Sequence, residues 1–531
     1  MAHMPALSSK FIFTTSLLVM AMVCASGAPV PKRANSALNE ATSQDSASSI
    51  KWQSCANPNF SGWFEDYVQN VNTLQCATIR IALNKSNSAV AKANSSTAQT
   101  STSPNLAEPA TVIELALSKL PATGNRIGSV ISISGGPGQS GLDVTAMDSD
   151  AYHRLSKHFD IIGFAPRGVY PSTPNIKCDL THRTLHPTDP KAFAEGCWNH
   201  TPHDLLNQLG ADYSVKDIDV IRQALGESQI NVIGYSYGTK IAALYAEHYP
   251  DRLRAGVLDG VVNLNEDEVT MQLNQEASVQ QTFERFVQQC RREPHCFFAD
   301  STTIPQAEAK IAHLFGYLDS HEVLDDDGER ITPLHLSWTL YGFMAWPDRW
   351  PILNEVLWQL EAKDFSALKM MIDEDKGSID FATFTAIDCA ERAPNASKRA
   401  NYLQDSIRIN AQSTWDNHRP PKASELLDTC YYWPVAGSDT PHIPKLAASA
   451  PTLLLVAQTN DAATPYANAL AMQHYLNAVL LTREGDGHTL VLADDSRCVD
   501  NKVVDYLIDP QSFKKLAGLP PQDKRALICR D

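Results

Sequence analysis

The pentapeptide GYSYG at residues 234–238 constrains the fold of this chain more than any other stretch. A short apolar run, 230–233, precedes it, and an Ala-rich segment with helical spacing follows it. This order predicts a strand, a sharp turn and a helix, with Ser236 at the apex of the turn. The helix N-terminus beneath the serine would present unpaired N–H groups to an oxyanion. Because Gly-x-Ser-x-Gly also arises by chance, the prediction of a nucleophile depends on partners elsewhere in the chain.

Two later segments supply candidate partners. Asp461 follows an apolar strand predicted over 450–458, and His488 follows a second strand predicted over 478–482. Ser, Asp and His, each just after a predicted strand, stand in the order of the α/β-hydrolase topology. In that chemistry His488 takes the proton of Ser236 and later gives it to the leaving group, while Asp461 orients the imidazole. The alternatives are a helix N-cap for Asp461 and a surface histidine for His488.

A glycine-rich loop, GGPG at 135–138, follows a buried strand predicted over 127–134. Acyl transfer needs backbone N–H groups aimed at the oxyanion, and a loop almost without side chains lets a substrate approach them. Gly136 is the first candidate donor, and Tyr237, just after the nucleophile, is the second. A further strand, predicted over 159–167, ends at Arg167, which either anchors the loops above the sheet or is a solvated turn arginine.

Alternating strand and helix patterns predict an α/β fold with a mostly parallel sheet covered by helices on both faces. The segments QCATIRIALN and TVIELALSKL predict an antiparallel edge pair with a loose tip. From 263 to 449 the pattern is helical, so we expect a cap inserted before the strand that leads to Asp461. Its aromatic residues fit either core packing or a substrate wall. The expected divisions are a signal peptide (1–28), a disordered segment (29–50), the first part of an α/β-hydrolase core (51–262), the helical cap (263–449) and the C-terminal part of the core (450–531).

The N-terminus carries the parts of a secretory signal peptide. Lys10 precedes a mostly apolar run, 11–23, and small residues follow at 25–28. The run is too short for a comfortable membrane span, so we expect export to an extracellular or periplasmic location, with cleavage within 25–28. Cys24 stands where a lipoprotein cysteine could lie, but Val23 is larger than the small residue that such processing prefers, which argues against lipidation.

Ten cysteines remain after Cys24 is removed with the signal peptide, and an even set on an exported chain predicts disulfides rather than metal ligands. Pairing nearest neighbours gives Cys55–Cys76, Cys178–Cys197, Cys290–Cys296, Cys389–Cys430 and Cys498–Cys529. Since the sequence has no CxxC, no HExxH, no phosphate-binding loop and no dinucleotide fingerprint, we expect neither a metal nor an organic cofactor. The net charge of −16 argues against a general nucleic-acid or anionic-membrane binder.

The ordered set of motifs resembles the tripeptidyl aminopeptidase-like branch of the α/β-hydrolases, which is related to the proline iminopeptidases. The matching stretches are WQSC (52–55), QCATI (75–79), GGPGQSG (135–141), FAPRGV (164–169), GYSYGT (234–239), VLDGVV (257–262), AIDCAE (386–391), NDAATP (460–465), GDGHTL (485–490) and the closing cysteines. The resemblance implies a cap domain, a Ser-Asp-His triad and release of short peptides, such as tripeptides, or single residues from substrate N-termini. The family usually has an acid at the position of Ala165 and a glycine at the position of Tyr170. These two departures concern substrate preference and leave the triad unchanged.

The resemblance also draws attention to Asp388 and Glu391. A free, cationic peptide N-terminus needs a carboxylate partner, which either acid could supply. The alternative is an exposed acid near a disulfide that does not bind substrate. The sequence leaves two other functions open. One is an esterase or lipase with the same triad, because the cap decides the substrate, and the other is a non-catalytic binding protein on a hydrolase scaffold.

Overall fold

The computed structural model describes residues 50–64, 71–83, 111–178, 189–324, 328, 330–369, 381–517 and 527–531. Three expected segments lie outside these residues: the signal peptide, nearly all of the disordered segment, and the loose tip of the edge pair, a stretch rich in Ser, Thr, Asn and Ala at 85–109.

The main sheet of the described residues has ten strands. Their spatial order is β1 (Gln53–Ser54), β2 (Gln75–Ala82), β3 (Val112–Leu120), β5 (Phe159–Phe164), β4 (Gly128–Ile133), β6 (Ile230–Tyr235), β7 (Leu253–Asp259), β10 (Leu454–Asn460), β11 (Val479–Asp486) and β12 (Ile528–Cys529). The pairs from β1 to β5 are antiparallel, and those from β5 through β4 to β12 are parallel. The mostly parallel sheet and the antiparallel edge pair are therefore as predicted.

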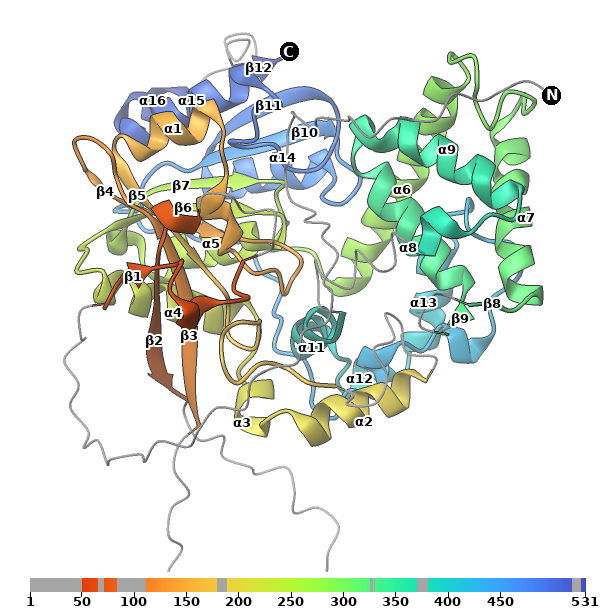
Figure 1. Ribbon diagram of the computed structural model, residues 1–531, viewed down its shortest axis with the longest axis horizontal. Helices are drawn as coiled ribbons and strands as arrows, with labels where there is room; N and C mark the ends of the chain where they lie inside the picture. Colours follow the sequence, from red (N-terminus) through yellow and green to blue (C-terminus); the bar gives the residue numbers. More distant parts are fainter. Residues whose placement is uncertain are drawn as a thin grey trace, which may run out of the picture.

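Helices cover both faces of the sheet (Figure 1). One face packs against α1 (Asp150–Ser156), α15 (Arg497–Ile508) and α16 (Pro510–Ala517), and the other against α4 (Ala211–Ala224), α5 (Tyr237–His248) and α14 (Tyr466–Leu476). Side chains of one strand alternate between the two cores: in β10, Leu454 and Val456 join the first core and Leu455 and Ala457 the second. This double coverage explains why the central strands are apolar throughout.

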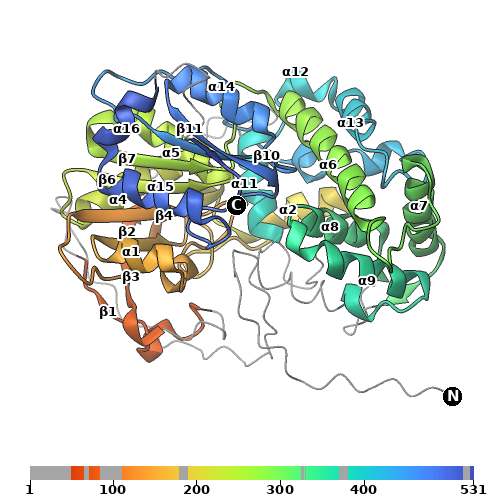
Figure 2. The same cartoon turned by 90° about the horizontal axis from the view of Figure 1, so that it is seen from above.

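The expected cap is mostly helical, but it divides between two cores. The helices α6 (Glu268–Cys290), α7 (Ile304–Ser320), α8 (Pro333–Met344) and α9 (Trp350–Glu361) enclose their own aromatic core, with Phe283, Phe286 and Trp415 among its members. Figure 2 shows these four helices as a group beside the sheet. The helix α11 (Phe381–Arg392) packs instead on a core of the sheet, through Ile387 and Cys389. The short α12 (Ala396–Arg399), α13 (Tyr402–Asn410) and the hairpin β8 (Val323–Leu324) to β9 (Arg330–Ile331) complete this part.

The sequence of 205–225 predicts one continuous helix, but the structure interrupts it. The helix α3 (His203–Leu206) ends before Gly210 and α4 begins after it. Gly210 has φ of 98°, a conformation that favours glycine and that no helix contains. The helix α2 (Pro190–His200) lies beside α3 at the same edge of the molecule (Figure 1).

Five disulfides join the described segments: Cys55–Cys76, Cys178–Cys197, Cys290–Cys296, Cys389–Cys430 and Cys498–Cys529. These are the pairs that nearest-neighbour order gives. They are consistent with an exported protein, in which oxidised cysteines persist. Within the described ranges, every helix is too short or too polar to cross a membrane.

Candidate active site

Ser236 occupies the turn between β6 and α5 in a strained backbone conformation, with φ of 53° and ψ of −121°. Its N–H donates to the carbonyl oxygen of Asp259 over 2.8 Å, which ties the turn to the neighbouring β7. The two glycines of the pentapeptide are sterically required. A Cβ on Gly234 would lie 2.4 Å from the carbonyl oxygen of Gly238, and one on Gly238 would lie 2.2 Å from that of Ile133.

Asp461 and His488 meet at the same edge of the sheet, where β10 and β11 end. The Nδ1 of His488 lies 2.9 and 3.0 Å from the two carboxylate oxygens of Asp461. The Asp461 carboxylate also accepts the N–H groups of Ala463 and Thr464 and the hydroxyl of Thr464. The N-cap interpretation of Asp461 is wrong, because α14 begins at Tyr466 and Pro465 is its N-cap. The bonds from the turn at Ala463 and Thr464 instead fix the carboxylate that holds the imidazole.

The imidazole lies close to the serine turn. Gly260 follows Asp259, whose carbonyl holds the Ser236 N–H, and a Cβ on Gly260 would lie 3.0 Å from His488 Cε1. The side chains of His488 and Asp461 are 12% and 1% exposed. Burial disfavours the imidazolium, but the charge and hydrogen bond of Asp461 outweigh burial and raise the pKa of His488 above its usual value.

Asp259 is a buried acid at the carboxyl end of β7, to which the sequence pattern assigns no role. Its Oδ2 accepts the N–H groups of Leu490 and Val491 over 2.7 and 2.8 Å, just beyond His488, and its Oδ1 has no hydrogen-bond partner among the described residues. Burial raises the pKa of Asp259 to about 7, although those two N–H groups oppose the rise. One residue thus contacts both the serine turn, through its carbonyl, and the histidine loop, through its carboxylate.

The glycine-rich loop lies against the serine turn. A Cβ on Gly135 would be 3.0 Å from Ser236 Cβ, and Gly136 and Gly138 have φ of 99° and 91°. Tyr237 is the first residue of α5, where a backbone N–H has no acceptor within the helix. The two candidate oxyanion donors, Gly136 and Tyr237, therefore border the same turn.

A small pocket lies behind the glycine-rich loop, and Arg167 forms part of its lining together with Ser134, Gly135, Gly138, Pro166, Gly210, Ser214, Tyr237, Ile241 and Ile387. Arg167 is 4% exposed, and it donates to both oxygens of Asp217 and to the carbonyl of Gln208. Of the two interpretations of Arg167, the anchor fits the structure, because its guanidinium is buried and paired.

Glu391 is bound on three sides. Its carboxylate accepts the hydroxyl of Tyr237 over 2.8 Å and the N–H of Ala211 over 2.7 Å, and it lies 2.9 Å from Nζ of Lys240. Lys240 also pairs with Asp439 over 2.8 Å. Burial lowers the pKa of Lys240, but the two acids overcome this and raise it.

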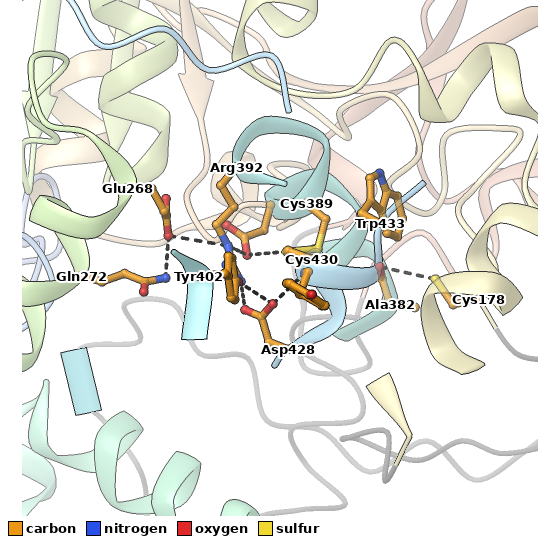
Figure 3. Close-up of a disulfide and its surroundings, with 12 residues drawn as sticks. Cys178, Glu268, Gln272, Ala382, Cys389, Arg392, Tyr402, Asp428, Cys430 and Trp433 are labelled. Atoms are coloured by element: carbon orange, nitrogen blue, oxygen red, sulfur yellow. Dashed lines mark hydrogen bonds and ion pairs between the residues drawn. A yellow bond between two sulfur atoms is a disulfide. The ribbon is translucent and has the colours of Figure 1, made fainter. Parts of the chain in front are cut away.

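Asp388 lies one turn away on α11 and pairs with Arg392 over 2.5 Å. Arg392 also approaches Asp428 and Glu268, beside the Cys389–Cys430 disulfide, as Figure 3 shows. Burial raises the pKa of Asp388 and raises that of Glu268 to about 7, with Arg392 opposing both. The two predicted substrate-binding acids thus belong to two buried ion-pair networks.

The cap packs directly on the turns that carry Asp461 and His488. From α6, Gln275 donates to the carbonyl of Ala463 over 2.9 Å, and Ser278 donates to that of Asp461 over 3.1 Å. Arg285, also on α6, pairs with Asp486. Asp486, two residues before His488, is a nearby acid that could compete with Asp461 for the imidazole in the sequence of this loop, but it is held by the cap instead.

Two groups of described residues have the spacing of metal ligands, Asp388 with Cys389 and Cys430, and Cys498 with Cys529 and Asp531. In both groups the cysteines form a disulfide, so their sulfurs are not thiolates.

Comparisons with known proteins show which family the chain resembles. Residues 419–515 match the family model described as TAP-like protein. The putative hydrolase YuaR of Escherichia coli is 31% identical over 88% of this chain and 92% of its own length. The serine protease Hip1 of Mycobacterium tuberculosis is 30% identical over 75% and 82%, and a tripeptidyl aminopeptidase of Streptomyces lividans is 27% identical over 75% and 78%.

Proposed function

Because the chain belongs to the serine peptidases of the α/β-hydrolase superfamily, we propose that it is an exopeptidase that releases short peptides, such as tripeptides, from substrate N-termini through an acyl-enzyme on Ser236. The observation that carries the proposal is the bond between His488 Nδ1 and Asp461 beside the strained serine turn. This arrangement fixes the tautomer that leaves Nε2 free to act as a base.

In the proposed reaction, His488 takes the proton from the Ser236 hydroxyl as its oxygen attacks the scissile carbonyl carbon. The N–H groups of Gly136 and Tyr237 stabilise the oxyanion. The imidazolium, held by Asp461, then protonates the leaving amine as the C–N bond breaks. Water, activated by the same imidazole, hydrolyses the acyl-enzyme and restores the serine.

Recognition of a free N-terminus has electrostatic support. Among the described residues, the networks around Lys240 and Arg392 join five carboxylates to two cations; the carboxylates are those of Glu391, Asp439, Asp388, Asp428 and Glu268. Their excess negative charge lies beside Tyr237 and would attract an ammonium group. We therefore assign Glu391 and Asp388 to the recognition of the substrate N-terminus.

A panel of short peptides, analysed by mass spectrometry of the products, tests the activity. We expect release of N-terminal fragments from free peptides, much slower cleavage of N-acetylated ones, and no cleavage by Ser236→Ala. Faster turnover of fatty-acyl esters than of any peptide would favour the esterase alternative. Cleavage within chains regardless of the N-terminus would contradict an exopeptidase.

The acids have their own test. Glu391→Gln with Asp388→Asn should raise KM for free-amine peptides by about tenfold, the effect of roughly one lost charge-assisted bond, and spare N-blocked esters. Glu484→Gln is the matched control, since Glu484 is exposed at the surface, where it pairs with Arg530. Equal losses on both substrate types would reject the recognition role.

The proposed site of action is outside the cytoplasm. The signal-peptide pattern and the five disulfides support export. N-terminal sequencing of the mature protein should begin within or just after residues 25–28, whereas a mature chain that still starts at Met1 would contradict this.

A further inference from the structure

The helix α8 has one face in the cap and one face open. Leu336, Leu340 and Phe343 are buried in the aromatic core of the cap. The opposite face carries Trp338 and, four residues later, Gly342, the spacing of neighbours on a helix surface. The Trp338 side chain is 44% exposed, although a tryptophan normally buries most of its surface.

Two contacts connect this part of the cap with the candidate active site. Trp338 packs edge-on against Phe384 at 6.2 Å between ring centroids, and a Cβ on Gly138 would lie 3.1 Å from the backbone nitrogen of Phe384. Eight residues after Trp338, Trp346 packs edge-on against His488 at 6.4 Å. The face of α8 therefore begins beside Phe384 and the glycine-rich loop, and Trp346, two residues beyond the end of α8, continues it to the imidazole. Figures 1 and 2 both place α8 on the side of the cap nearer the sheet.

Gly342 leaves a gap in the middle of this face. A Cβ built on Gly342 would meet no atom within 4 Å. Glycine inside a helix is unfavourable, and among the described residues no neighbouring atom gives a steric reason for it here. The missing side chain leaves open space one helical turn after Trp338.

We propose that the open face of α8 is the roof of the acyl-side subsite, and that Gly342 provides the space for a large apolar side chain on the residue whose carbonyl Ser236 attacks. This inference rests on the proposed function. His488 must protonate the leaving group, so the leaving group lies beneath Trp346. The acyl-side residue then lies toward the glycine-rich loop, under Trp338 and Gly342. Aromatic walls favour an apolar side chain there.

The test uses p-nitroanilide substrates that share one N-terminal dipeptide and differ only in the acyl-side residue, which is Ala, Leu or Phe. The wild-type protein should prefer Leu or Phe. Gly342→Ala should lower kcat/KM for Leu and Phe about tenfold or more and for Ala much less, because one added methyl group in a filled pocket has an effect of that size.

Gly316 provides a matched control. It lies in α7, on the far side of the cap, and a Cβ there also meets nothing within 4 Å. Gly316→Ala should leave the substrate preference unchanged, while both variants melt at or above the wild-type temperature. If Gly342→Ala folds poorly, Trp338→Ala, which removes an exposed side chain, should weaken the preference for Phe.

Three results would overturn the proposal. One is a Gly342→Ala profile that equals the wild type or that of Gly316→Ala. Another is an equal loss on Ala, Leu and Phe, and the third is a loss that follows the leaving group instead of the acyl residue. The same three acyl residues, presented as p-nitrophenyl esters, separate the proposed function from the proposed subsite. If the wild-type protein cleaves only the esters, the peptidase function is rejected, and the ester series still tests the role of Gly342.

Discussion

At the scale of single residues, the account depends on how firmly His488 is held. Its ring is fixed by Asp461 on one side, and the loop beyond it is fixed by Asp259 through the N–H groups of Leu490 and Val491. Asp259 also accepts the Ser236 N–H through its carbonyl oxygen, so one residue links the turn that carries Ser236 to the loop beyond His488.

Asp259→Ala should lower kcat about 100-fold with little change in KM, because a shift of about 1 Å in a catalytic group has such an effect. It should also destabilise the fold by about 1–3 kcal/mol, since two buried N–H groups lose their acceptor. Asp259→Asn keeps an oxygen acceptor and should stay within a few-fold of wild type. Steady-state kinetics of both variants measure these effects. A kcat of Asp259→Ala equal to that of the wild type would contradict this role.

The raised pKa of His488 predicts the acid side of the pH profile. The base must be neutral, so kcat/KM should rise with pH through a pKa above the ordinary value for histidine, about 6.5. Asp461→Asn removes the charge that raises the pKa, so the acid limb should move to lower pH while kcat falls about 10⁴-fold. An acid limb that stays in place in Asp461→Asn would show that another group titrates.

Local patterns predicted Ser236, Asp461 and His488, because each directly follows a strand of strong apolar character. The partners of Glu391 and Asp388 could not be predicted in the same way. Lys240 and Ala211 come from segments far away in the chain, and only the tertiary fold brings them to Glu391.

At the scale of elements, the strands were predictable from their apolar runs, while some boundaries were not. The strand β11 extends to Asp486 instead of ending at residue 482, since its parallel pairing with β10 continues through polar residues. Helix propensity did not reveal the interruption between α3 and α4 at Gly210, because this interruption depends on contact with Glu391 on α11. A Cβ on Gly210 would lie 2.9 Å from Glu391 Cγ.

Gly210→Ala should therefore destabilise the protein by about 1–3 kcal/mol through backbone strain, and by more through displacement of Glu391. Gly226→Ala is the comparison, since Gly226 has φ of 74° but a Cβ there meets nothing within 4 Å. Urea unfolding should rank Gly210→Ala as clearly less stable. Equal stability of the two variants would mean that the contact with Glu391 is unimportant.

At the scale of the whole molecule, the division of the cap between two cores was not predictable, because a helical pattern does not say which partner a helix packs on. The helix α11 belongs to the core of the sheet and is joined by Cys389–Cys430 to a segment 41 residues away. This disulfide therefore holds the acids beside the catalytic turn.

Replacing Cys389 and Cys430 by alanine should cost about 4 kcal/mol of unfolding free energy, by the entropy of a loop of this length. The matched change at Cys290–Cys296, separated by only 6 residues, should cost about 2 kcal/mol. Thermal and urea unfolding measure both. A larger loss from the Cys290–Cys296 change would contradict the account of α11 as the anchored element.

The central claim is that Ser236 is a nucleophile activated by His488 and Asp461. Labelling with a fluorophosphonate probe, followed by mass spectrometry of the peptides, tests it most directly. We expect one adduct, on Ser236, that forms much more slowly in His488→Ala. An unlabelled Ser236 in a protein that still turns over its substrates, or an adduct on a different residue, would contradict the claim.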